Sequence, residues 1–140
     1  MPSAAPGADL AAQTIGQGDV RMSLLSMAMV AAAVDAGRWH VPQVLQTAAG
    51  AASPGAAMDP GMVSALRGLM SGAVRSGAAK AAGLPGAQVY GQVGLVHIGS
   101  GWISWFVGYR GDIAIAAIES GQTAQLSAAA LAGAFFAALR

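Results

Sequence analysis

Few side chains in this sequence are of the types that carry out catalysis, and they are scattered. Ser100, His97 and Asp112 are the residue types of a nucleophile, its base and an orienting acid. A serine nucleophile of this class can sit in a Gly-x-Ser-x-Gly elbow, a pattern that the sequence lacks. Because Ser100 falls instead in an expected hairpin turn, we do not expect these three residues to form a catalytic triad.

Metal chemistry is disfavoured for a similar reason. His40 and His97 are the two histidines, and neither has clustered carboxylates beside it. The sequence has no cysteine, which excludes disulfides, thiol catalysis and cysteine metal ligands. We therefore expect no metal ion and no cofactor.

One short segment has the pattern of a strand that a ligand could approach. Residues 89–96 read Val-Tyr-Gly-Gln-Val-Gly-Leu-Val and carry two glycines. A glycine in a strand marks a bulge or a tightly packed neighbour, or it lets a ligand backbone come close. For Gly94 we favour the bulge or packing explanation, with close approach of a ligand as the alternative.

Two helices are expected before this strand. From Ser23 to Ala36 apolar residues recur at helical spacing, with Ser23 as the N-cap and Gly37 as the C-cap. Asp59 is a plausible N-cap for the second helix, with a proline at its first position, and this helix should end near Gly77.

After the second helix the apolar period changes to two, which predicts three strands. They span residues 88–97, 102–109 and 113–119 and are joined by glycine-containing turns, a pattern typical of antiparallel hairpins. Both alternating faces of the middle strand are apolar, so helices should cover both sides of the sheet. We expect Arg110 to be solvated and Glu119 to lie at an edge exposed to water.

A last helix is expected within residues 123–139, with Leu131, Phe135 and Leu139 on one stripe and Phe136 beside it, able to cover one face of the sheet. The uncharged stretch 120–139 is mostly alanine and contains several polar residues, so we do not interpret it as a membrane span. The fold class is therefore α/β of the α+β type, with an antiparallel sheet of about three strands and helices on its faces.

Composition limits the possible partners. Hydrophobic residues make up 55% of the 140 residues and charged residues only 9%, so some apolar surface should meet a partner. The net charge is +1 and the basic residues are not clustered, so we expect no nucleic acid binding. We divide the chain into a flexible lead-in at 1–14 and one domain at 15–140, with a small-residue surface loop at 46–58.

Several segments, in order, resemble the C-terminal half of a penicillin-binding protein transpeptidase domain, the serine acyltransferase fold shared with serine β-lactamases. Residues 15–18 read Ile-Gly-Gln-Gly, and 23–28 are similar to the family's Thr-Pro-Leu-Gln-Met-Ala helix opening. Residues 77–79 lie where the family has Gly-Thr-Ala, and 105–109 match its Trp-Phe-Val-Gly-Tyr strand. The resemblance implies that the chain is part of a penicillin-binding protein/β-lactamase-like transpeptidase fold.

The resemblance places Gln92, Val93, Gly94 and Leu95 where the family carries Lys-Thr-Gly-Thr, a strand that binds the substrate's terminal carboxylate. Three of these four positions differ, so the motif is degenerate. The carboxylate anchor is expected to be lost, while the backbone N–H of Leu95 stands where the family has half of its oxyanion hole.

The family's other two motifs are missing. Its chemistry needs a serine with a lysine three residues later, and a Ser-x-Asn loop. The single lysine is Lys80, with Gly77 three residues before it, and the sequence contains no asparagine. No catalytic residue is therefore expected in this chain, which should begin partway through the family domain, and whether a longer parent protein is an enzyme stays open.

The expected function follows from the resemblance. It is a segment of a transpeptidase-like domain in peptidoglycan (cell wall) synthesis, at the extracytoplasmic face of the membrane, whose parent binds penicillin. The alternative is a non-catalytic scaffold that binds other cell-wall or division proteins. The expected partners are the N-terminal half of the same domain or a second copy of this chain, and in the parent a peptidoglycan stem peptide or β-lactam.

Overall fold

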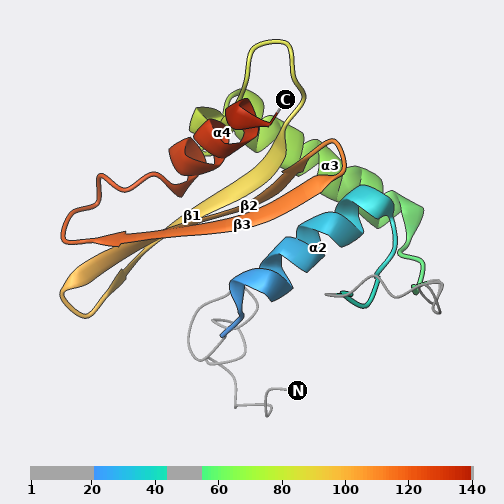
Figure 1. Cartoon of the computed structure of the whole chain (residues 1–140), viewed down its shortest axis with the longest axis horizontal. Helices are drawn as coiled ribbons and strands as arrows, with labels where there is room; N and C mark the ends of the chain where they lie inside the picture. Colours follow the sequence, from blue (N-terminus) through green and yellow to red (C-terminus); the bar gives the residue numbers. More distant parts are fainter. Residues whose placement is uncertain (1–20, 44–54, 140) are drawn as a thin grey trace.

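The computed structural model describes residues 21–43 and 55–139 (Figure 1). A three-stranded antiparallel sheet, in the order β1-β2-β3, lies between helices. Its strands are β1 (Tyr90–Ile98), β2 (Gly101–Arg110) and β3 (Ile113–Gly121), and its helices are α2 (Leu24–Ala36), α3 (Pro60–Arg75), the single 3₁₀ turn η1 (Lys80–Ala82) and α4 (Ala128–Ala138). The predicted α+β class and the three predicted strands are confirmed.

The first two helices begin where their capping residues predict. The Ser23 hydroxyl accepts the Ser26 N–H at 3.1 Å, and the Asp59 carboxylate accepts the Met62 N–H at 2.8 Å. Gly37 ends α2 in the left-handed conformation, with φ at 67°. Helix α3 ends at Arg75, slightly before the predicted end.

Two predictions on domain organisation concern mostly residues outside the described ranges. The lead-in at 1–14 and most of the 46–58 loop lie there, so both stay predictions. The described end of the loop lies against the segment that follows α2, because the Trp39 N–H donates to the Ala56 carbonyl at 2.9 Å.

Helices cover both faces of the sheet, as predicted (Figure 1). On one face, Phe106 of β2 packs against α4 and the segment around η1. On the other face, Val107 and Tyr109 pack against α2, with Leu66 and Met70 of α3 beside them. Alternation along β2 thus sends successive side chains into two separate cores.

The predicted covering side of α4 is right only in part: Phe136 is buried and Leu139 packs partly against the core. Leu131 and Phe135 are exposed, and the buried side is formed by small residues with one aromatic: Ala128, Ala129, Ala132, Gly133 and Phe136. The small residues let the helix approach closely, since a Cβ at Gly133 would lie 2.6 Å from the Ala81 carbonyl oxygen. Close contact with η1 therefore decides which side of α4 faces the core.

Polar side chains of the sheet hold both ends of α4. At its start, the buried Ser104 hydroxyl accepts the Ala128 N–H at 3.1 Å, and the Glu119 carboxylate accepts the Ser127 N–H at 2.8 Å. At its end, Arg110 donates to the Phe136 and Leu139 carbonyls. Glu119 lies on the edge strand β3, as expected, but it and Arg110 are half-buried and satisfy helix ends instead of being fully solvated.

None of the helices among the described residues has the length and hydropathy needed to cross a lipid bilayer.

Tyr109 is the one described residue with a buried side-chain polar atom that lacks a hydrogen-bond partner. Its side chain is 2% exposed, and its ring stacks on Tyr90 with centroids 4.8 Å apart. Burial raises the pKa of the Tyr109 phenol above 10.0; Arg67 opposes this shift through its positive charge and as a nearby donor, and Asp35 and Tyr90 add to it. The folded chain therefore favours the neutral phenol.

This orphaned hydroxyl predicts the behaviour of Tyr109→Phe. The variant should keep its stability within about 1 kcal/mol or gain some, because Arg67 is near the phenol but no hydrogen bond of normal geometry is lost. Above pH 10.0 the tyrosine of the unfolded chain ionises before the buried one, so wild type should lose stability as pH rises through the folded pKa, and the variant should lack that part of the loss. Urea unfolding at about pH 8 and about pH 10.5 measures both effects; a loss above about 2 kcal/mol at the lower pH would reveal a hidden partner.

Candidate functional site

The four residues that the sequence resemblance compares with the family's Lys-Thr-Gly-Thr strand, 92–95, lie together on β1, at an edge of the sheet (Figure 1). Val93 pairs with Phe106 and Gly94 with Trp105 in a register that runs unbroken from Tyr90 to Ile98. An unbroken register leaves no extra residue in either strand. The bulge explanation for Gly94 is therefore wrong.

Close packing against a neighbouring side chain explains why residue 94 is a glycine. A Cβ at this position would lie 2.3 to 2.4 Å from three atoms of the Trp105 indole, which occupies the space above the glycine. Trp105 in turn packs on the core formed with α2. The glycine thus lets an aromatic ring lie across β1.

The turn between β1 and β2 fixes which backbone groups point outward. Gly99, with φ at 60°, opens a two-residue turn closed by the pair Ile98 and Gly101. The residues that flank such a turn exchange hydrogen bonds, and pairing alternates along the strand from there. Even-numbered residues of β1 therefore bond to β2, while Val93, Leu95 and His97 direct their N–H and C=O groups away from the sheet.

One side-chain hydrogen bond supports this alternation of inward-facing and outward-facing backbone groups along β1. The side-chain Oε1 of Gln92 accepts the Val93 N–H at 3.1 Å, so this N–H is not directed at β2. The exposure of Leu95 is 46%, and Gly91 is buried. The accessible part of this edge thus begins at Val93.

The side chains of the site are uncharged. Val93 packs partly into the core under α4, Gln92 is exposed, and β1 carries no lysine or arginine. Arg67 donates to the Val34 and Asp35 carbonyls at the end of α2, and Arg110 donates to the end of α4. Of the described residues, those of β1 offer a ligand backbone groups and apolar contact but no ion pair.

The structure does not bring together the residues considered for a catalytic triad. His97 stacks near Trp102, with ring centroids 4.9 Å apart, and Ser100 lies in the adjacent turn. Asp112 lies in the turn at the opposite end of β2. Within the described ranges no three histidine, cysteine or acidic side chains are grouped so that they could hold a metal ion.

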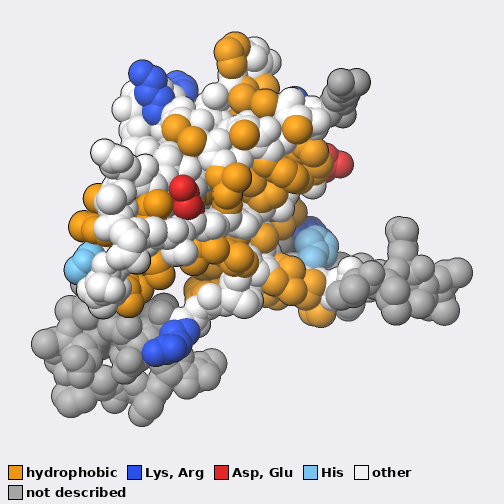
Figure 2. All heavy atoms as spheres, turned by 60° about the vertical axis from the view of Figure 1, so that its left-hand side comes forward, with side chains coloured by type: hydrophobic (Ala, Val, Ile, Leu, Met, Phe, Trp, Pro, Cys, Tyr) orange, Lys and Arg blue, Asp and Glu red, His pale blue; other side chains and the backbone are white. Residues whose placement is uncertain are grey.

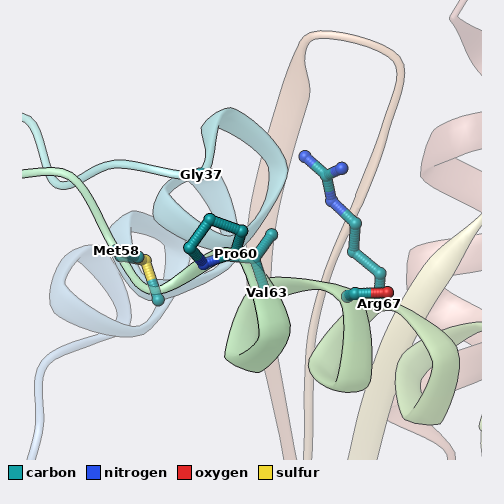
Figure 3. Close-up of a pocket in the computed structure, with 6 residues that line it drawn as sticks. Gly37, Met58, Pro60, Val63 and Arg67 are labelled. Atoms are coloured by element: carbon teal, nitrogen blue, oxygen red, sulfur yellow. The ribbon is translucent and has the colours of Figure 1, made fainter.

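Sequence reasoning did not foresee a pocket of about 300 Å³ between the end of α2 and the start of α3. It is lined by Gly37, Met58, Pro60, Val63, Ser64 and Arg67. Figure 3 shows Arg67 rising from α3 beside it. Its lining includes no residue of β1, and nothing in the local sequence pattern marks it.

The packing over β1 predicts opposite effects for two glycine substitutions. Gly94→Ala should destabilise the chain by about 1–3 kcal/mol, because the added methyl group overlaps the Trp105 ring. Gly68→Ala, in the interior of α3 with no atom near its Cβ position, should stabilise by about 0.5–1 kcal/mol. Urea unfolding followed by tryptophan fluorescence compares them; equal stabilities would contradict the packing of Trp105 on Gly94.

No protein-family model matches the sequence, and no curated protein matches it. Solved structures do match. Penicillin-binding protein A from M. tuberculosis, in its imipenem acyl-enzyme complex, is 22% identical with a TM-score of 0.71, over 94% of this chain and 34% of that one. The D,D-transpeptidase domain of a peptidoglycan glycosyltransferase from Eggerthella lenta is 25% identical with a TM-score of 0.61, over 85% and 32%.

A further structure of PBPA from Mycobacterium tuberculosis is 21% identical with a TM-score of 0.59, over 89% of this chain and 34% of that one. The chain spans about a third of the length of each solved structure. The resemblance is confirmed at the level of the fold: the chain has the architecture of part of a penicillin-binding protein transpeptidase domain.

Proposed function

We propose that this chain supplies the substrate-facing strand of a transpeptidase-like domain that acts in peptidoglycan synthesis at the extracytoplasmic face of the membrane. The observation that carries the proposal is the outer edge of β1, where the backbone groups of Leu95 and His97 point away from the sheet in a fold shared with penicillin-binding proteins. Residues outside this chain supply the nucleophilic serine and its lysine, so this chain is not catalytic by itself.

The geometry supports one catalytic contribution from this chain. The outward N–H of Leu95 can donate to an oxyanion that develops on a substrate carbonyl, and this donor does not depend on the side chain. The carboxylate of a substrate or β-lactam finds no lysine or arginine on β1. Each charge-assisted hydrogen bond lost in this way is worth about 1.5–3 kcal/mol, so binding is weaker than with a lysine strand.

The second candidate function is a non-catalytic scaffold that binds other cell-wall or division proteins. The uncharged surface of β1 favours it, because Gln92 and Val93 cannot anchor a carboxylate as lysine and threonine do. Exposed apolar residues favour a protein partner as well, and Figure 2 shows one face rich in apolar side chains with few charges.

The proposal also includes a partner strand at the opposite edge of the sheet, beside β3. The Gly111–Asp112 turn is closed by the pair Arg110 and Ile113, so Ala114, Ala116, Ile118 and Ser120 direct their backbone groups outward from β3. None of these four is charged or proline, the residues that usually protect an edge strand. We infer that the N-terminal half of the domain pairs here, and that a second copy takes its place when the chain is alone.

Covalent labelling with a fluorescent penicillin tests the catalytic proposal. The parent protein should be labelled and the 140-residue chain should not. In the parent, Leu95→Pro should slow labelling by about 10²–10³-fold, since proline removes the N–H that serves the oxyanion and is tolerated at an edge position whose N–H faces outward. Leu95→Ala, the matched control, keeps the N–H and should label within a few-fold of wild type.

The labelling outcomes separate the two functions. No labelling of the parent would favour the scaffold. Labelling of the 140-residue chain itself would contradict the conclusion that it lacks the nucleophile. Equal labelling rates for the proline and alanine variants would contradict the role given to the Leu95 N–H.

The exposed β3 edge predicts that the isolated chain self-associates. Sedimentation velocity over increasing concentration should show dimers or larger species of the wild type. Ala116→Pro removes an outward N–H of β3 and should shift the chain towards monomer, whereas Ala116→Val keeps that N–H and should not. A wild type that stays monomeric and unfolds cooperatively would argue against a missing strand at β3.

A further inference from the structure

Gln92 occupies an unusual place on β1. Its own backbone groups pair with Val107 of β2, so its main chain is satisfied inside the sheet. Its exposed side chain turns along the strand, and its carbonyl oxygen accepts the Val93 N–H at 3.1 Å. The main chain of Gln92 is bonded to β2, yet its side chain occupies the outward-facing N–H of the next residue, Val93.

This donor is the first accessible one of the edge. Gly91, the preceding outward residue, is buried, and Leu95 and His97 follow in exposed positions. Among the described residues, no side chain accepts the N–H of Leu95. A peptide that adds to this edge as a new strand would hydrogen-bond to alternate residues of β1. At Val93 it would find the N–H already bonded to the Gln92 oxygen, and at Leu95 and His97 it would find N–H groups that no described side chain occupies.

The hydrogen bond between the Gln92 side chain and the Val93 N–H can break and re-form. Gln92 is exposed, and when its side chain rotates away its amide is hydrated again, so opening costs only the exchange of one neutral hydrogen bond for water. The opened edge offers a ligand no lysine or arginine. A ligand gains from backbone pairing along Val93 and Leu95, and a carboxylate adds nothing.

We propose that Gln92 is a gate on the β1 edge: its side-chain oxygen competes with an incoming peptide for the Val93 N–H, and the opened edge selects an extended, uncharged peptide backbone. This inference rests on the proposed role of β1 as the substrate-facing strand and adds a regulation of that site. Natural sheets protect their edges by related means, and here the protecting group can move.

Amide hydrogen exchange of the 140-residue chain tests the closure directly. Gln92→Ala removes the acceptor and should speed exchange of the Val93 N–H about three- to tenfold. Leu95, on the same edge without a side-chain acceptor, should not change. Gln92→Glu keeps an acceptor oxygen and should exchange like wild type. An unchanged Val93 rate in Gln92→Ala would overturn the proposal.

Peptide binding tests the gate. The probe is an end-blocked acetyl-Thr-Val-Thr-Val-Thr-amide peptide, and calorimetric titration should find it bound by Gln92→Ala about three- to tenfold more tightly than by wild type or Gln92→Glu. The same peptide with a free carboxylate should bind no more tightly than the amide. Equal binding by all three chains, no binding by any of them, or a preference for the carboxylate would overturn the gate. Because neither readout involves acylation, penicillin labelling of the parent can fail while both succeed.

Discussion

The burial of β2 between two cores is the constraint on which the other elements depend. Phe106 is 1% exposed beneath α4, and Tyr109 is 2% exposed beneath α2, although both belong to the same strand. A strand that fills both faces can be paired in one register only, because a slip of one residue would exchange the two sets of side chains. β1 and β3 take their positions from it, and the outward groups of β1 follow from that register.

Because of this dependence, the backbone geometry of β1 does not rely on the identity of its exposed side chains. The outward direction of the Leu95 N–H is set by the turn at Gly99 and by pairing with β2, to which the side chain of Leu95 contributes nothing. Gln92, by contrast, faces solvent, so its identity is not fixed by packing. A backbone donor and a charged anchor in the same motif are thus under different physical constraints.

Much of this arrangement can be predicted from the sequence. Ser23, Asp59 and Gly37 mark helix ends through capping, and the period of two beyond residue 88 marks the strands. The predictions failed where tertiary contact decides. The exposed side of α4 carries Leu131 and Phe135 because alanines and Gly133 allow a closer approach to η1. The hydrogen bond of Glu119 to the start of α4 and the bond of Gln92 to Val93 have no counterpart in local spacing.

The central claim is that β1 is an open edge with a fixed alternation, and residue-resolved amide exchange of the wild-type chain tests it most directly. The account predicts slow exchange at Gly94 and Val96, which bond to β2, and fast exchange at Leu95 and His97, which face outward. Slow exchange at Leu95 as well would mean that another segment covers the edge. Reversed alternation would mean that the register is shifted by one residue, and either result would contradict the site described for this strand.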